Sequence, residues 1–156
     1  MKSKMNAFFV GLCILLGGLA KAQVAPVDKQ NIANGGYDVV AYFEDSKAER
    51  GKSEYAYIYN GAKYYFVTEE HLQHFRFVPE MYLPQCDGYC AYAVAAKKTK
   101  VPINPETFKI VDGKLYLFFN GKVNGKLLSA LPEWNKDEEN LLKQLPANWE
   151  KLKGAN

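Results

Sequence analysis

Four side chains that can bind metals or act as nucleophiles fall close together in the sequence. His71 and His74, the two histidines of the chain, are followed by Cys86 and Cys90. Two imidazoles and two thiolates form a ligand set that suits zinc or copper(I). Residues at i and i+3 of a helix share one face, so His71 and His74 can point the same way. The first hypothesis is therefore a transition-metal site with Cys90, His71, Cys86 and His74 as candidate ligands.

The same residues allow other interpretations. Cys86 and Cys90, four positions apart, can form a disulfide in an oxidising compartment, or Cys90 can be a small buried hydrophobic residue. A thiol at a helix start, paired with His71, would resemble an activated nucleophile. The one candidate for an orienting third group is Asp38, which we interpret instead as an acid in a turn or on the rim of the sheet. We predict no catalytic residue.

The first 22 residues have the pattern of a secretory signal peptide. Lys2 and Lys4 precede an apolar run, and Ala20-Lys21-Ala22 is a small-x-small cleavage site. The apolar run is shorter than the ~18–20 residues that a membrane span needs. We therefore expect an exported protein, periplasmic or secreted, with no membrane span in its mature form.

Removal of this segment changes the charge of the chain. The full sequence has 20 basic and 17 acidic residues and a net charge of +3. Three of the lysines lie in residues 1–22, which hold no acid, so the mature chain is neutral. A neutral domain argues against nucleic acid as a partner. Residues 23–34 are polar and predict a flexible lead-in, and residues 35–152 are of a length that forms one domain.

Turn residues and hydrophobic alternation predict the strands. Asn60-Gly61 separates strands at 54–59 and 62–67, and Asp112-Gly113 separates strands at 108–111 and 114–119. Both dipeptides favour type I′ turns and therefore predict two hairpins. A further strand is expected at 37–44, which is rich in aromatic and β-branched residues.

Helices are expected between and after the hairpins. Thr68 is a good N-cap for a helix over 69–77 that Pro79 ends, and an Ala-rich segment predicts a second helix over 88–98. The tail, 133–152, predicts two short helices split at Pro146. The expected fold class is α+β, with a small, mostly antiparallel sheet built from two hairpins and short helices packed against it.

Several of these segments resemble the YHS domain family. The stretch "YYFVTEEHLQHFRFVPEMYLPQ" is similar to its pattern of an aromatic-x-Phe strand end, a short helix and Phe-x-x-x-Pro-x-x-Tyr. The matching residues are Tyr64, Phe66, Phe75, Pro79 and Tyr82. "GGYDVVAYFE" and "GYCAYAVA" resemble an exported bacterial subgroup of the family, and the resemblance covers roughly residues 35–119.

The resemblance implies a function connected with metals. Metal-handling relatives often place a cysteine directly after the strand Phe and a second cysteine four residues later, positions that here hold Val67 and His71. Cys90 matches the cysteine of the exported subgroup. The leading hypothesis is an exported, non-enzymatic YHS-type domain that binds or senses copper or zinc through Cys90 and nearby ligands. The alternative is a structural or protein-interaction module with an unknown protein partner, whose Cys86 and Cys90 are inert or disulfide-bonded.

Tyrosines near the cysteines offer one more possibility. Tyr64, Tyr65, Tyr89 and Tyr92 can line a pocket for a small ligand, but tyrosines more often cover a sheet of modest size. We interpret them as such a cover.

Overall fold

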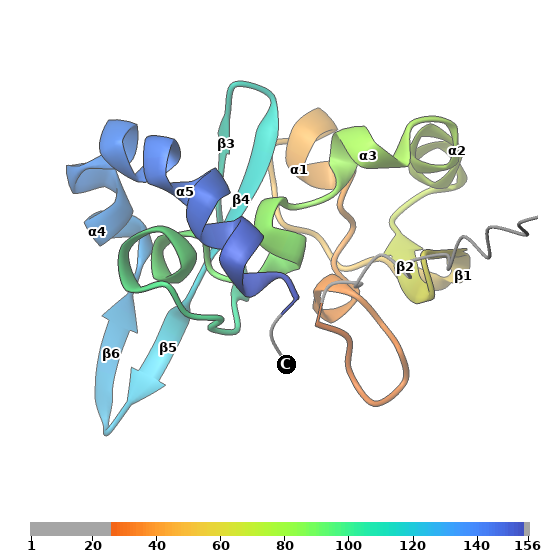
Figure 1. Cartoon of the computed structure of the whole chain (residues 1–156). Helices are drawn as coiled ribbons and strands as arrows, with labels where there is room; N and C mark the ends of the chain where they lie inside the picture. Colours follow the sequence, from red (N-terminus) through yellow and green to blue (C-terminus); the bar gives the residue numbers. More distant parts are fainter. Residues whose placement is uncertain (1–25, 155–156) are drawn as a thin grey trace, which may run out of the picture.

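The computed structural model describes residues 26–154 of the chain (Figure 1). The expected signal peptide, 1–22, lies outside the described residues. Within these residues the chain forms three antiparallel hairpins, each a separate two-stranded sheet, with helices between and beside them. The α+β class is therefore confirmed, but the strands do not join into the single sheet of two hairpins that the sequence predicts.

The first hairpin and the helices after it form the N-terminal half of the molecule. Strand β1 (Lys52–Tyr59) pairs with β2 (Ala62–Phe66), and the chain continues into α2 (Glu69–Phe77) and α3 (Pro79–Tyr82). Asn60 and Gly61 have φ values of 48° and 83°, which confirms the predicted turn. The Thr68 side chain accepts a hydrogen bond from the His71 amide and so caps α2 as expected.

The aromatic residues that carry the YHS resemblance pack into one core cluster of this half. Phe75 of α2 is fully buried, and its ring centroid lies 5.0 Å from that of Tyr64 and 5.1 Å from that of Phe66. Tyr82 of α3 belongs to the same cluster. These contacts fix α2 against the hairpin, and thereby fix the two histidines that α2 carries.

The C-terminal half has two hairpins and the longest helix of the described part. Strand β3 (Asn104–Val111) pairs with β4 (Lys114–Phe118), and β5 (Asn120–Val123) pairs with β6 (Lys126–Ser129). Helices α4 (Leu131–Lys136) and α5 (Glu138–Leu152) follow. Trp134, which is fully buried, anchors this second core cluster.

The segment 37–44 is not the strand that its composition predicts. A short 3-10 turn, η1 (Asn34–Gly36), leads into helix α1 (Ala41–Glu44). The reason is the Asp38 carboxylate, whose Oδ1 accepts hydrogen bonds from the amides of Val40 (2.8 Å) and Ala41 (3.3 Å). A carboxylate that satisfies the first free amides favours a helix start over an extended chain.

Two predicted helix boundaries are also wrong. The helix predicted over 88–98 begins only at Ala91 and becomes the π-helix η3 (Ala93–Lys97), whereas Gly88 ends a preceding 3-10 turn, η2 (Gln85–Gly88). The tail breaks at Asp137 rather than at Pro146, which lies inside α5. Pro146 is exposed, and the helix continues past it to the buried Asn148.

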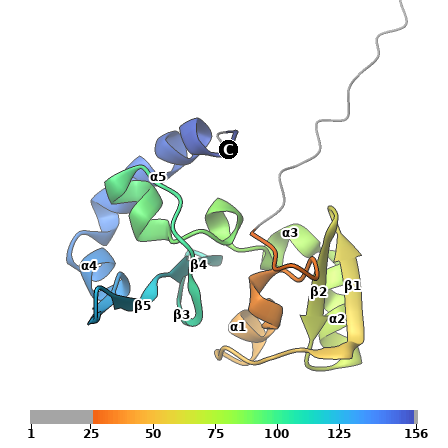
Figure 2. The same ribbon diagram turned by 90° about the horizontal axis from the view of Figure 1, so that it is seen from below.

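The two halves meet around α1. Figures 1 and 2 show α1 between the β1–β2 and β3–β4 hairpins. Tyr42 of α1 packs with Leu115 and Leu117 of β4 in a third cluster, and its hydroxyl donates to the Pro105 carbonyl at 2.8 Å. Helix α1 is therefore held from both sides, which positions the acidic residues at its end.

Candidate functional site

The two histidines of α2 have different environments. The His71 side chain is 10% exposed, whereas that of His74 is 42% exposed. Both face the segment that contains α1, because His71 contacts Asp38 and His74 contacts Glu44. The predicted sharing of one helix face is confirmed, but the facing groups are carboxylates rather than the two cysteines.

The strongest contact of His71 is to Asp38. The Asp38 side chain has no exposed surface, and its Oδ2 lies 2.7 Å from His71 Nδ1 and 2.8 Å from the amide nitrogen of Val67. A carboxylate can only accept, so Nδ1 carries the proton and donates it. In the neutral imidazole this leaves the Nε2 lone pair free to accept a proton or bind a metal. Asp38 stands directly before a turn, as one of the two expectations had it, but it is fully buried rather than on the rim of the sheet.

Two further carboxylates surround the free side of His71. Nε2 of His71 lies 3.8 Å from Asp45 Oδ2 and 4.0 Å from Glu44 Oε2. Glu44 also reaches the second histidine, with 3.0 Å between its Oε1 and His74 Nδ1. We call these five residues, Asp38, Glu44, Asp45, His71 and His74, the His71 cluster. It opens toward solvent on the side of Glu44, Asp45 and His74, which are each about one-third exposed or more.

Glu44 is held in its ionised form by its neighbours. Partial burial opposes ionisation, but the hydrogen bonds that Glu44 shares with the Tyr82 hydroxyl (2.8 Å) and His74 hold its pKa below the ordinary value of 4.5. The charge of His74 and His71 acts in the same direction. A carboxylate therefore faces His71 Nε2 at neutral pH.

The cysteines lie in the other core cluster. Cys86 and Cys90 are both buried free thiols among residues that pack around Trp134. Burial, together with the charge of Asp87, raises the pKa of Cys86 to about 12, so it is a neutral thiol at physiological pH. Cys90 is 1% exposed, and its amide donates to the Val101 carbonyl at 3.0 Å. These features suit core packing better than nucleophilic chemistry.

The structure thus divides the four predicted ligands into two pairs. His71 and His74 are joined with Asp38 and Glu44, and Cys86 and Cys90 lie in the core of the other half. Among residues 26–154, as the side chains stand, no three or more histidine, cysteine, aspartate or glutamate residues are gathered tightly enough to hold a metal ion. A site that combines His71 with Cys90 is not assembled.

Sequence reasoning named Asp38 only as a candidate orienting group, and it missed the other two carboxylates of the His71 cluster, Glu44 and Asp45. Glu44 and Asp45 lie in a segment interpreted as the end of a strand and a charged loop. A signal was present, because Asp38 followed by Val39-Val40 and, further on, by Glu44 is compatible with a capped helix start. The aromatic and β-branched composition of 37–43 outweighed it.

None of the known protein families, curated proteins or solved structures compared with this chain matches it. In the described part of the chain, no helix combines the length and the apolar character needed to cross a membrane.

Proposed function

We propose that this chain is an exported YHS-type domain that binds a transition metal, zinc or copper, and that the site is centred on His71 rather than on Cys90. One observation carries the proposal: the buried Asp38 carboxylate holds His71 Nδ1 at 2.7 Å, and Nε2 faces Glu44 and Asp45. Metal-binding histidines almost always donate their other ring N–H to such a second group, which fixes the tautomer and the ring orientation.

The distances around Nε2 are close to those of a metal site. Two ligand atoms about 2.1 Å from a tetrahedral zinc are about 3.4 Å apart. The oxygens of Asp45 and Glu44 lie 3.8 and 4.0 Å from Nε2, so each must approach by about half an ångström. Both side chains are partly exposed and can make that adjustment by rotation. His74, beside Glu44, is available as a fourth ligand.

The chemistry of these ligands narrows the choice of metal. Imidazole and carboxylate suit zinc(II) and copper(II), whereas copper(I) prefers sulfur. A divalent cation would also offset the negative charge of Glu44 and Asp45, which face the same nitrogen. The YHS resemblance supports a metal role, and the packing of its aromatic residues around α2 supports the assignment of this segment as scaffold.

A second candidate function rests on the same contacts. If His71 is protonated, it makes ion pairs with Asp38, Asp45 and Glu44 without any metal. The cluster would then stabilise a structural or protein-interaction module. The two functions differ in what binds at Nε2, and a metal titration separates them.

The test is calorimetric titration of the reduced mature protein, residues 23–156, with zinc and with copper(II). We expect binding of one metal ion, with a loss of at least tenfold in affinity for His71→Gln and a smaller loss for Asp45→Asn. Cys90→Ala is the control for the original hypothesis and should bind as the wild type does. Glu139→Gln, at a carboxylate that is 83% exposed on α5, is the matched surface control.

Two results would contradict the proposal. One is a wild-type protein that binds neither metal, which would favour the structural module. The other is a Cys90→Ala variant that loses binding while His71→Gln retains it. Thermal unfolding of each variant shows whether a loss reflects the site or the fold. N-terminal sequencing of the exported protein tests the cleavage expected before Gln23.

A further inference from the structure

A cavity of about 310 Å³ lies in the C-terminal half of the molecule, away from the His71 cluster. Its walls come from three elements: η2, the β3–β4 hairpin near its turn, and α5. A dry apolar cavity of about 150 Å³ holds one molecule of benzene. The cavity beside α5 therefore has room for one ring and a short substituent.

The less exposed part of the wall is largely apolar. Leu142, Leu145 and Trp149 of α5 line it, and Leu145 is buried. Cys86 of η2 also lines it, and because this thiol is neutral at physiological pH, it acts there as a small hydrophobic group. The indole ring of Trp149 is half-buried and favours contact with another flat ring. These walls favour a ligand with an aromatic body.

The exposed lining residues carry charges that balance. Asp112 and Lys114, on either side of the turn at Gly113, have opposite charges. Glu150 of α5 is paired with Lys153, with 2.7 Å between Oε1 and Nζ. The rim of the cavity therefore has no net charge, which favours an uncharged ligand.

Tyr116 of β4 provides a hydroxyl group on the wall of this cavity. The residue is 5% exposed, and its ring packs on Trp134 with 5.5 Å between the centroids. Within residues 26–154, no hydrogen bond engages the hydroxyl. Its oxygen keeps some accessible surface, so a group in the cavity can reach it. Because a buried tyrosine hydroxyl usually has a partner, this one is a natural anchor for a ligand.

The Tyr116 hydroxyl is a donor at physiological pH. Burial raises the pKa of Tyr116 above the ordinary value of 10.0, and the nearby Cys86, Asp112 and Glu138 act in the same direction. The hydroxyl therefore keeps its proton, and an acceptor atom placed in the cavity would receive it.

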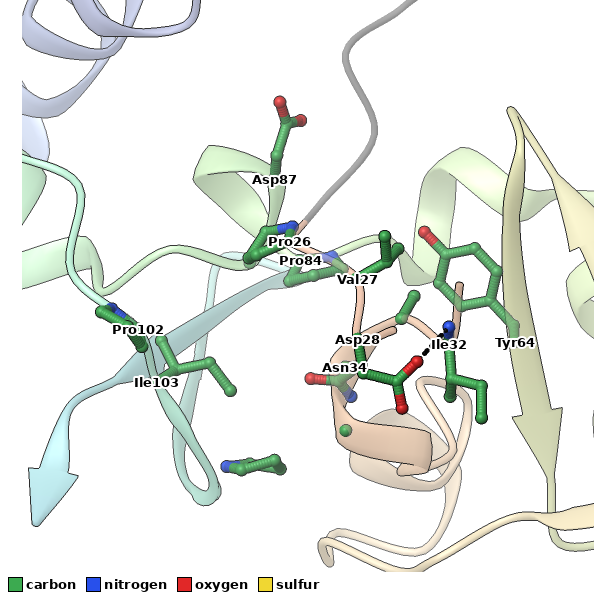
Figure 3. A pocket seen from close by; sticks show the side chains of 14 residues that line it. Pro26, Val27, Asp28, Ile32, Asn34, Tyr64, Pro84, Asp87, Pro102 and Ile103 are labelled. Carbon is green, nitrogen blue, oxygen red and sulfur yellow. Dashed lines mark hydrogen bonds between the residues drawn. The ribbon is translucent and has the colours of Figure 1, made fainter. Parts of the chain in front are cut away.

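A second cavity, of about 260 Å³, offers a ligand no comparable anchor (Figure 3). The amide oxygen of Asn34 has no hydrogen-bond partner, but it is closed off so completely that no ligand atom can reach it. Oδ1 of Asp28 already accepts two backbone amides at 2.9 Å. The Asp87 carboxylate points away from the other labelled side chains in Figure 3. The reachable hydroxyl of Tyr116 therefore distinguishes the cavity beside α5.

We propose that the cavity beside α5 binds a small, uncharged aromatic molecule with one hydrogen-bond acceptor, which receives the Tyr116 hydroxyl. Acetophenone has these features, because it carries a single carbonyl oxygen on a short substituent of a benzene ring. α-Methylstyrene has nearly the same shape, but a CH2 group replaces that oxygen, so it lacks the acceptor. The two molecules therefore test the ring and the acceptor separately.

The test is NMR titration of the mature protein, residues 23–156, with both probes in the presence of EDTA, so that the result does not depend on metal binding. Tyr116→Phe removes the hydroxyl alone. It should weaken acetophenone binding about fivefold to tenfold, as expected for the loss of one neutral hydrogen bond, and leave α-methylstyrene binding unchanged. Because the hydroxyl has no partner in the described part of the chain, this variant should unfold at the same temperature as the wild type.

Two further variants separate this cavity from the rest of the surface. Leu142→Trp fills the cavity and should abolish the binding of both probes. Leu127→Trp makes the same substitution at a leucine of β6 that is 71% exposed, and it should leave binding unchanged. The proposal is overturned if acetophenone does not bind at millimolar concentration, if Tyr116→Phe binds acetophenone as the wild type does or weakens both probes equally, or if Leu142→Trp leaves binding intact.

Discussion

Substitution of Asp38 by asparagine tests the central contact of the His71 cluster. The side chain has no exposed surface, and its two oxygens accept four hydrogen bonds: Oδ1 from the amides of Val40 and Ala41, and Oδ2 from the amide of Val67 and from His71 Nδ1. Asparagine keeps the shape of the side chain and can keep Oδ1. Its NH2 group would replace Oδ2 and face the Val67 amide, which is also a donor.

The expected cost follows from these contacts. The Val67 amide loses its acceptor, which costs about 1–3 kcal/mol if no water replaces it. His71 can adapt by moving its proton to Nε2, so that Nδ1 accepts from the new NH2 group. This exchanges a charge-assisted bond, about 1.5–3 kcal/mol, for a neutral one of about 1 kcal/mol. Together, the two effects should lower the free energy of unfolding by about 3 kcal/mol. Typical proteins have a free energy of unfolding of only about 5–15 kcal/mol, so this is a large loss.

Urea unfolding, followed by tryptophan fluorescence, measures this loss. Asp45→Asn is the control, because Asp45 is partly exposed and approaches His71 only at 3.8 Å. It should change the free energy of unfolding by less than about 1 kcal/mol. The new tautomer also places a proton on Nε2, so Asp38→Asn should weaken zinc binding even where the protein remains folded. If Asp38→Asn lowers the free energy of unfolding by less than about 1 kcal/mol, the stabilising role that we infer for this network is wrong.

Two other predictions concern pH and thiol reactivity. Because the pKa of Glu44 is lowered on folding, its contribution to stability is present above pH 4.5 and is lost as the pH falls below that value. Tyr82→Phe removes one donor to Glu44. In urea unfolding it should therefore lower the free energy of unfolding by about 1 kcal/mol at pH 7 and by less at pH 3. An equal loss at both pH values would contradict this prediction. With its pKa raised to about 12, Cys86 in the folded protein should react with iodoacetamide at pH 8 on the order of a thousandfold more slowly than a free thiol. Intact mass in denaturant then distinguishes two alkylated cysteines from a Cys86–Cys90 disulfide, which lowers the mass by about 2 Da and blocks alkylation.

The strength of local signals explains which elements the sequence predicts. Asn60-Gly61 and Asp112-Gly113 lie between strands that alternate clearly, so both hairpins are found. Asn124-Gly125 closes the third hairpin with the same turn chemistry, at φ values of 50° and 79°. Its strands are short and mostly exposed, and so they lack the alternation that a buried face imposes. Turn chemistry alone did not reveal them.

The candidate site was harder to predict because its members come from segments far apart in the sequence. His71 and Cys90 are close in sequence, but α3 and η2 carry the chain from the first core cluster to the second between them. Asp38 and His71 are 33 positions apart and share a hydrogen bond. Proximity along the chain was therefore a poor guide to which side chains meet.

The missed helix and the missed carboxylates have a common cause in Asp38. One oxygen of this carboxylate satisfies the amides at the start of α1, and the other holds the Val67 amide and His71 Nδ1. The helix start brings Glu44 and Asp45 around to the side on which His71 Nε2 is left free. Had residues 37–44 been extended, these carboxylates would have followed a straight chain of about 3.3 Å per residue, some 20 Å from Asp38. The same buried carboxyl group thus starts the helix and orients the imidazole, and a variant that disturbs it should affect the fold and the proposed metal site together.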